Sequence, residues 1–326
     1  MSEAGGHPIE ARSLVKRYGH VTAVDHVDLT VEAGSVYGYL GPNGAGKTTS
    51  LRMLLGLIRP DAGSARLFGR DPLQEGAAAL DGVAGFVEAP RFYPYLNGRR
   101  NLELMAALDG GDAGERIDQA LDTVDLADRQ GDKVKGYSHG MKQRLGIAAA
   151  LLRAPRLLLL DEPTTGLDPA GMRDMRVLVR RLADEGMTVL LSSHLMGEVE
   201  ELCDRVAIVR SGQVIYEGAL DALLHSTGQS YRLRTTDDVR AQAVCSAQAG
   251  IREVEAGGDG IAFAVEGDRD RAVAELSIAL VEAGVGIVAL VPASASLEEL
   301  FFRLTEGDGL VPSGGDGGRP AAAVAR

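Results

Sequence analysis

Eight consecutive residues decide the fold: Gly41-Pro42-Asn43-Gly44-Ala45-Gly46-Lys47-Thr48. An apolar run at residues 36–40 precedes them, and a helix is predicted over residues 49–58. A strand, a glycine-rich turn and a helix in this order predict a phosphate-binding loop, because glycine lets backbone N–H groups approach a phosphate closely. The N-terminus of the following helix adds a partial positive charge. The stretch therefore predicts a nucleotide site.

The side chains at the end of this loop predict the contacts to the nucleotide. Lys47 is expected to reach the β- and γ-phosphates, and the hydroxyl of Thr48 is expected to be a ligand of Mg²⁺. We assign the whole stretch from Gly41 to Thr48, together with Thr49, to the bound nucleotide.

A pair of carboxylates follows a second buried strand. The run of four leucines at residues 157–160 predicts a central parallel strand, and Asp161-Glu162 comes directly after it. Ligands of open α/β sheets bind at the carboxyl ends of the strands. We therefore expect Asp161 to hold Mg²⁺ and Glu162 to act as the base for a water molecule. The alternative is two solvated acids after a core strand, which the phosphate loop upstream disfavours.

A third motif carries a family resemblance. Residues 137–144 read YSHGMKQR, and here the chain resembles the ATP-binding-cassette (ABC) ATPases, whose signature is LSGGQ followed by a basic residue, Gln and Arg. The chain departs from that signature at Tyr137, His139 and Met141, and it keeps Ser138 and Gly140. The resemblance implies that Ser138 and Gly140 close on the γ-phosphate held by a second subunit.

Other positions follow the order of the family. Asp168 ends a Gly-Leu-Asp segment that resembles the D-loop, and His194 matches the histidine that contacts the γ-phosphate. Tyr18 matches the aromatic residue that stacks on adenine. Glu88 stands where most relatives carry a glutamine that contacts Mg²⁺ and the reacting water. Residues 88–94 (EAPRFYP) resemble the branch that exports drugs and peptide antibiotics.

The resemblance covers about residues 9–224 and implies the fold. We expect an α/β P-loop NTPase of the ABC cassette type over residues 1–225, with a parallel core sheet, an antiparallel β edge and a helical arm at residues 99–124. Residues 226–305 predict a small α+β accessory domain, with strands at 230–235, 260–265 and 285–291 and helices at 239–250, 269–283 and 296–304. Residues 306–326 are rich in Gly, Pro, Ser and Ala and predict a disordered tail.

Composition limits the possible partners and compartments. The formal net charge of -12 argues against a nucleic-acid surface. No stretch approaches the ~18 to 20 apolar residues that a membrane span needs, and the N-terminus lacks the layout of a signal peptide. The two cysteines, Cys203 and Cys245, have no metal-binding spacing and fit a reduced compartment.

These observations together predict an ATP-hydrolysing subunit of an ABC transporter that uses ATP and Mg²⁺. We expect an exporter of a hydrophobic drug or antibiotic, a separately encoded transmembrane permease, a homodimer around two ATP molecules, and a peripheral location at the cytoplasmic face of the cell membrane. The alternative is a soluble ABC ATPase of translation or DNA repair. A single cassette and the absence of sustained heptads disfavour it. Intact Glu162 and His194 disfavour a purely regulatory nucleotide-binding protein.

Overall fold

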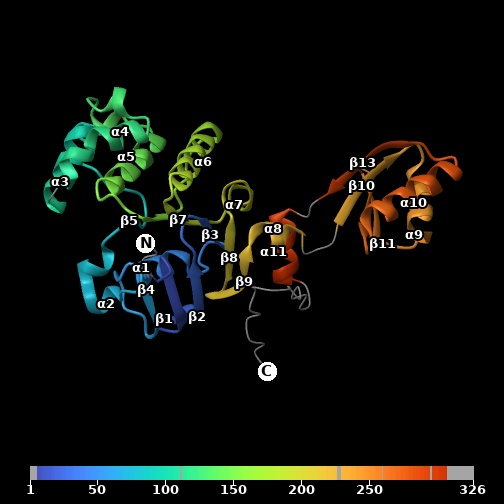
Figure 1. Ribbon diagram of the computed structural model, residues 1–326, viewed down its shortest axis with the longest axis horizontal. Helices are drawn as coiled ribbons and strands as arrows, with labels where there is room; N and C mark the ends of the chain where they lie inside the picture. Colours follow the sequence, from blue (N-terminus) through green and yellow to red (C-terminus); the bar gives the residue numbers. More distant parts are fainter. Residues whose placement is uncertain (1–5, 111, 226–228, 259, 294–295, 307–326) are drawn as a thin grey trace, which may run out of the picture. The chain divides into compact units, whose positions relative to one another are not determined.

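The structure is a computed structural model that describes residues 6–110, 112–225, 229–258, 260–293 and 296–306 (Figure 1). It divides into two compact units, one that runs through Ala219 and another that begins at Leu220. The domain boundary expected after residue 225 differs slightly from this division, because helix α8 (Leu220–His225) is grouped with the second unit. The predicted tail lies outside the described residues, except for Glu306.

A six-stranded sheet forms the centre of the first unit. Its strands, in spatial order, are β5 (Val83–Phe86), β6 (Leu157–Asp161), β7 (Thr188–Ser193), β3 (Val36–Leu40), β8 (Arg205–Arg210) and β9 (Gln213–Ala219). The pairs from β5 to β8 are parallel, and β9 joins β8 antiparallel. All residues of β3, β6 and β7 are buried, as expected for parallel strands that are covered on both faces. The predicted parallel core with an antiparallel edge is confirmed.

The register of this sheet aligns the chemistry-bearing residues. Leu40 at the end of β3 pairs with Ser193 at the end of β7, and Asp161 at the end of β6 pairs with Ser192. The phosphate loop, the two carboxylates and His194 therefore all leave the sheet at one edge.

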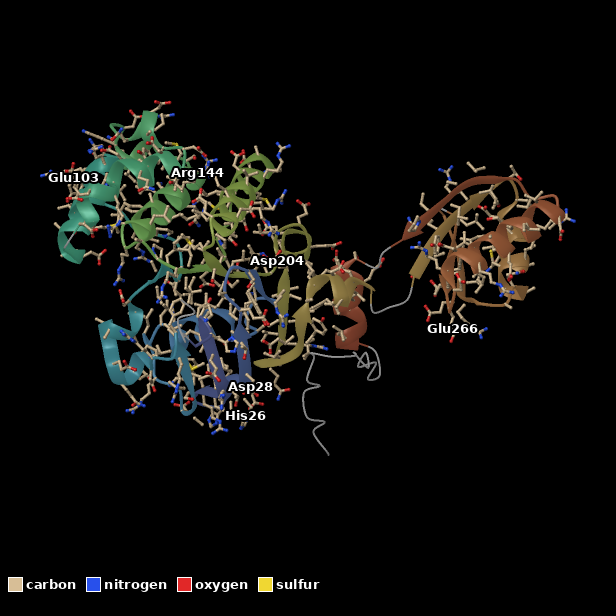
Figure 2. The ribbon with its side chains drawn as sticks, viewed as in Figure 1. His26, Asp28, Glu103, Arg144, Asp204 and Glu266 are labelled. Carbon is tan, nitrogen blue, oxygen red and sulfur yellow. The ribbon has the colours of Figure 1, made fainter. Side chains whose placement is uncertain are left out.

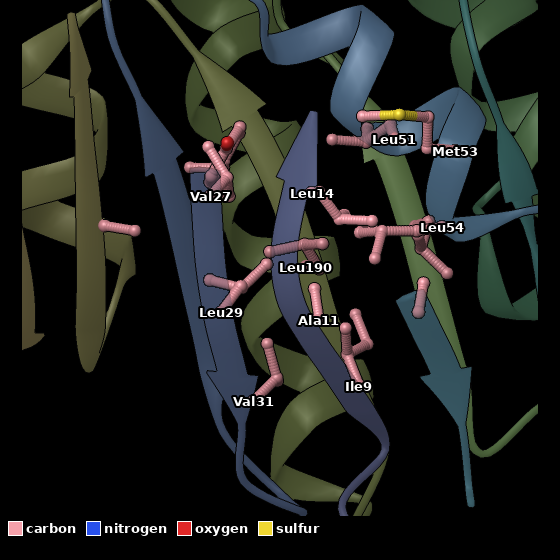
Figure 3. Close-up of a cluster of buried hydrophobic side chains, with 14 of the residues drawn as sticks. Ile9, Ala11, Leu14, Val27, Leu29, Val31, Leu51, Met53, Leu54 and Leu190 are labelled. Carbon is pink, nitrogen blue, oxygen red and sulfur yellow. The ribbon is translucent and has the colours of Figure 1, made fainter. Parts of the chain in front are cut away.

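A three-stranded antiparallel sheet makes a second layer of this unit. It consists of β2 (Val21–Val31), β1 (Ile9–Tyr18) and β4 (Ala62–Leu67) in that order. Its apolar face packs on helix α1 (Lys47–Leu54) in one hydrophobic cluster that also contains Leu190 of β7 (Figure 3). Burial of a side chain such as Leu51 contributes about 1.5–3 kcal/mol to folding. The helix after the phosphate loop is thus held firmly between the two sheets.

Helix α1 is shorter than predicted. It begins at Lys47, two residues before the expected start, and it ends at Leu54, not at residue 58. The backbone of Gly56 adopts a positive φ of 69°, which ends the helix in the left-handed region that glycine tolerates.

Helices complete the first unit. They are α2 (Pro72–Glu75), α3 (Gly98–Asp109), α4 (Ile117–Thr123), α5 (His139–Leu151), α6 (Pro169–Asp184) and α7 (Met196–Leu202), with short 3₁₀ turns η1 (Gly76–Leu80), η2 (Ala113–Arg116), η3 (Ala127–Arg129) and η4 (Val134–Gly136). Helices α3 and α4 form the predicted arm and pack against α5. Nowhere in the described ranges is a helix both long and apolar enough to cross a membrane.

The second unit has a core of its own. It contains β10 (Gln229–Thr235), α9 (Asp238–Ala247), β11 (Ile251–Gly257), β12 (Gly260–Val265), α10 (Arg269–Glu282), β13 (Ile287–Ala293) and α11 (Leu297–Glu306). The strands form an antiparallel sheet in the order β11-β12-β10-β13, and α9 and α10 share a hydrophobic cluster with it. The sequence prediction missed β11, extended α9 to residue 250 and started β13 two residues early. The alternation of strands and helices was otherwise correct.

Candidate functional site

The phosphate loop is shaped by close backbone packing. Gly44 and Gly46 have positive φ values of 81° and 101°, and Gly46 is the residue directly before α1. A Cβ atom on Gly46 would lie 2.2 Å from the carbonyl oxygen of Ala23 in β2. The N–H of Gly41 donates to the Ser193 carbonyl at 3.2 Å, which fixes the start of the loop to β7. Glycine is therefore required at residue 46 by both conformation and space.

Lys47 is the charged centre of the loop. Its side chain is 5% exposed, and its Nζ donates to the carbonyl oxygens of Gly41 at 2.8 Å and Pro42 at 3.2 Å. The same Nζ lies 3.2 Å from Oε1 of Glu162. A buried ammonium group needs such oxygen partners to offset its loss of hydration. The structure thus places Lys47 between the phosphate loop and the second predicted carboxylate.

Thr48 and Asp161 form a cluster of oxygen atoms at the end of β6. Thr48 Oγ1 donates to Asp161 Oδ2 at 2.9 Å, and Ser192 Oγ donates to Asp161 Oδ1 at 2.5 Å. Asp161 is 5% exposed. A carboxylate beside a hydroxyl is the hard oxygen donor set that Mg²⁺ prefers, so these two residues fit the predicted metal.

Glu162 lies at the meeting point of three side chains. His194 Nδ1 is 2.8 Å from Glu162 Oε2, and Thr165 Oγ1 donates to the same oxygen at 2.7 Å. Burial tends to raise the pKa of Glu162, but the hydrogen bonds from Thr165 and Lys47 and the nearby charges outweigh it, so this pKa is lowered. Its backbone has a positive φ of 49°. Glu162 is therefore an ionised, oriented acceptor beside the phosphate loop.

Ser192 and Thr165 belong to this cluster, although the sequence did not predict them. Ser192 Oγ accepts a hydrogen bond from the Glu162 N–H at 3.0 Å while it donates to Asp161, so one hydroxyl orients both acids. Ser192 is the penultimate residue of the buried strand β7, two residues before His194, and Thr165 directly precedes the Gly-Leu-Asp segment, but neither position by itself indicates these hydrogen bonds.

Other predicted site residues lie outside this cluster. Glu88 forms an ion pair with Arg52 of α1, so its carboxylate is directed to this arginine and not to Thr48 or Asp161. Tyr18 ends β1 with its side chain about half exposed, and Lys16 Nζ lies 5.7 Å from its ring centroid. An exposed ring can stack on a base, and stacking of Tyr18 on adenine stays a prediction.

The remaining predicted residues lie at helix starts. Ser138 caps α5, where its Oγ accepts from the Met141 N–H at 3.2 Å, and Gly140 lies in the first turn. Asp168 caps α6 by accepting from the Gly171 N–H at 2.8 Å. Because the first N–H groups of a helix lack intrahelical partners, the start of α5 is suited to bind an anion.

The fold and these side chains define a P-loop nucleoside-triphosphate hydrolase. A glycine-rich loop leads into a helix, and Asp161 and the Thr48 hydroxyl offer oxygen ligands for a metal. The Glu162 carboxylate lies 3.2 Å from Lys47 of the loop, where it can orient a water molecule beside a bound phosphate.

Comparison with known proteins gives the family. A family model described as ABC transporter matches residues 24–165. The chain is 38% identical over 302 residues to the bacitracin transport ATP-binding protein BcrA of Bacillus licheniformis, which covers 92% of this chain and 97% of that protein. It is 40% identical over 308 residues to the daunorubicin/doxorubicin resistance ATP-binding protein DrrA of Streptomyces peucetius, with 91% and 92% covered.

A solved structure supports the same family. It is an ATP-binding subunit of an ABC transporter, which matches with a TM-score of 0.60 and 28% sequence identity. The match covers 67% of this chain and 92% of that chain. The chain belongs to the ABC transporter family, as an ATP-binding subunit that hydrolyses ATP to drive transport. Nothing in these similarities favours a soluble ATPase of translation or DNA repair.

Proposed function

We propose that this subunit powers the export of a hydrophobic drug or peptide antibiotic through a separately encoded permease at the cytoplasmic face of the membrane. The supporting observation is the similarity to BcrA and DrrA, which extends over more than nine tenths of the chain and includes the second unit. BcrA is named for bacitracin transport, and DrrA for daunorubicin and doxorubicin resistance. The variant segment at residues 88–94 supports the same branch.

The contacts of the cluster support roles for Lys47, Thr48, Asp161, Glu162 and His194, whereas the roles of Tyr18 and Glu88 rest on the resemblance to the family. Lys47 and the loop amides bind the β- and γ-phosphates of ATP, with Thr49 beside them, and Tyr18 stacks on the adenine. Thr48 and Asp161 would hold Mg²⁺, with Glu88 contributing from the neighbouring loop. When bound there, Mg²⁺ would neutralise charge on the phosphate oxygens. Glu162 accepts a proton from the attacking water, and His194 orients Glu162 and contacts the γ-phosphate.

Two chains close on two ATP molecules in this proposal. Ser138 and Gly140 at the start of α5 bind the γ-phosphate held by the partner chain, and Asp168 lies at the contact between the two sites. Ser138 Oγ accepts from the Met141 N–H, and the earlier N–H groups of the first turn have no intrahelical acceptor, which suits an anion.

The domain organisation is part of the proposal. Residues 1–225 serve as the nucleotide-binding domain and residues 226–305 as an accessory module. Within its described residues the accessory module has no cluster of metal-ligating side chains, so docking or dimer contacts suit it better than catalysis.

Transport in vesicles tests the cargo. The chain is co-expressed with its separately encoded permease, and inside-out vesicles are supplied with MgATP and either bacitracin or daunorubicin. We expect ATP-dependent uptake of one compound, which the matched Glu162→Gln complex lacks. Uptake of neither compound by vesicles whose ATPase activity is intact would contradict the proposed cargo class.

A further inference from the structure

His139 contacts the turn that follows strand β6 and contains Glu162 and Thr165. It stands where the family signature has its first glycine, so its side chain is additional to that pattern. Its Nε2 lies 3.0 Å from the carbonyl oxygen of Thr165. Since a carbonyl oxygen only accepts, the ring N–H donates. The ring also lies 3.5 Å from the position of a Cβ atom on Gly166, so it covers this turn.

Thr165 connects this contact to Glu162. Its side-chain hydroxyl donates to Glu162 Oε2 at 2.7 Å, and its N–H donates to the Glu162 carbonyl at 3.2 Å. His194 approaches the same carboxylate oxygen at 2.8 Å. One residue therefore receives the His139 hydrogen bond on its backbone and orients the catalytic carboxylate with its side chain.

The two segments that His139 joins both begin helices. Ser138 caps α5 and Asp168 caps α6, and a Cβ atom on Gly140 would lie 3.6 Å from the Leu167 side chain. The helices are also linked by an ion pair at 2.9 Å between Arg144 of α5 and Asp174 of α6 (Figure 2 labels Arg144). The start of α5 therefore contacts the turn that holds Glu162 through His139 and Gly140.

We propose that His139 is a positioning residue that couples the signature segment of each chain to Glu162 of the same chain, through Thr165. The inference rests on the proposed function, in which Glu162 is the base and Ser138 and Gly140 serve the partner chain's ATP. When Ser138 and Gly140 close on the ATP held by the partner chain, the link through His139 and Thr165 then changes the orientation of Glu162 at the ATP held by its own chain. A glycine at residue 139 would have no side-chain N–H to donate to the Thr165 carbonyl oxygen.

Two substitutions of similar size distinguish the hydrogen bond of His139 from the space that its side chain fills. His139→Leu fills the space without a donor, whereas His139→Gln places an N–H₂ group at a similar reach. We expect His139→Leu to lower kcat about three- to tenfold, the range of one net hydrogen bond, with the KM for ATP within about twofold. His139→Gln should stay within about twofold of the parent in both constants. Equal losses in the two variants would overturn the proposal.

Thr165→Val tests the second link. This change keeps the shape of the side chain and removes the hydroxyl that reaches Glu162. If His139 acts through Thr165, adding His139→Leu to Thr165→Val should lower kcat by less than about twofold further. Fully additive losses would mean that His139 acts elsewhere, which contradicts the proposal.

Mixed dimers decide whether the effect stays within one chain. One chain carries Glu162→Gln, so only the site that uses the intact Glu162 of the other chain turns over. His139→Leu is then placed either in the chain with intact Glu162 or in the chain with Glu162→Gln. We expect the loss of turnover only in the first arrangement. A loss in the second arrangement, an equal loss in both, or no loss in either overturns the proposal.

The same experiment separates this inference from the proposed function. If dimers with Glu162→Gln in both chains still hydrolyse ATP near the parental rate, Glu162 is not the base and the proposed function fails. If those dimers are inactive and the His139→Leu dimers match the parent, only the coupling role of His139 is wrong. Cooperative thermal unfolding of each variant confirms that the compared chains are folded.

Discussion

Glu162 is the side chain on which the proposed chemistry depends most. Glu162→Gln should keep ATP binding, because Lys47 and the loop remain, and lower turnover by about 10²- to 10⁴-fold, the usual contribution of a general base. Turnover and nucleotide affinity are measured on the same preparation. Lys47→Ala is the matched control, and it should lose nucleotide affinity instead. Turnover of Glu162→Gln within about threefold of the parent contradicts the role.

The lowered pKa of Glu162 predicts how pH changes its contribution to stability. Because the folded pKa lies below the ordinary value of 4.5, the ionised carboxylate stabilises the fold above that value. This contribution disappears as the pH falls through the lowered pKa of the folded state. The parent should therefore exceed Glu162→Gln in free energy of unfolding at neutral pH, and the difference should shrink in acid. Denaturant unfolding at several pH values measures it; a difference that grows in acid contradicts the assignment.

Because Glu88 forms an exposed ion pair with Arg52, we expect removal of the Glu88 charge to have only a mild effect on ATP hydrolysis. Glu88→Gln keeps an oxygen atom for the metal, and exposed ion pairs contribute little, so hydrolysis should stay within about tenfold, or about 1.4 kcal/mol of barrier. Glu88→Ala should cost more, and should reduce stimulation by the permease more than basal turnover. Arg52→Gln serves as the control for loss of the pair. Normal stimulation of Glu88→Ala would remove Glu88 from the coupling role.

The phosphate loop as an element is constrained by its packing against β2. Gly46→Ala places a methyl group 2.2 Å from the Ala23 carbonyl oxygen, whereas a Cβ on Gly44 meets no atom within 4 Å. Both residues have positive φ, so both substitutions cost about 1–2 kcal/mol in backbone conformation. Gly46→Ala should lower the melting temperature clearly more than Gly44→Ala, as measured by thermal unfolding without nucleotide. Equal decreases in melting temperature for the two variants would mean that the contact between residue 46 and the Ala23 carbonyl oxygen relaxes without loss of stability.

The elements that the sequence predicted well are those with an uninterrupted pattern. The leucine run of β6 and the apolar run of β3 predict buried strands, and both strands are buried along their whole length. Strand β11 was missed because a bulge between Arg252 and Glu255, where Glu253 has a φ of 51°, breaks the alternation of its side chains. A period of two is the signal for a strand, and the bulge removes it.

Predicting the candidate site had a similar limit. Lys47, Thr48 and the Asp161-Glu162 pair could be predicted because each lies directly in a motif or at the end of an apolar strand. Ser192 could not, since its hydrogen bonds to both acids depend on the register of β7 beside β6. Pairing between strands distant in sequence is a property of the folded sheet, and a local pattern does not contain it.

The whole molecule combines two units whose hydrophobic clusters share no residue. Among the described residues, the hydrogen-bond and ion-pair partners of the Lys47 and Glu162 side chains belong to the first unit. Each unit therefore has its own source of stability, and the chemistry of ATP hydrolysis depends on the first. The second unit accompanies the cassette in BcrA and DrrA as well, because the similarity extends across both.

The proposed homodimer joins two chains that each carry a formal net charge of -12, so their overall electrostatic repulsion opposes closure and a bound ligand would have to offset it. ATP that binds mainly the closed pair stabilises it by about 2.7 kcal/mol at a hundredfold excess over the dissociation constant. Glu162→Gln should therefore shift from 34.3 kDa toward twice that mass when MgATP is added, as measured by light scattering. Glu162→Gln combined with Lys47→Ala should not shift. A mass unchanged by nucleotide, with the permease present as well, contradicts the closed homodimer.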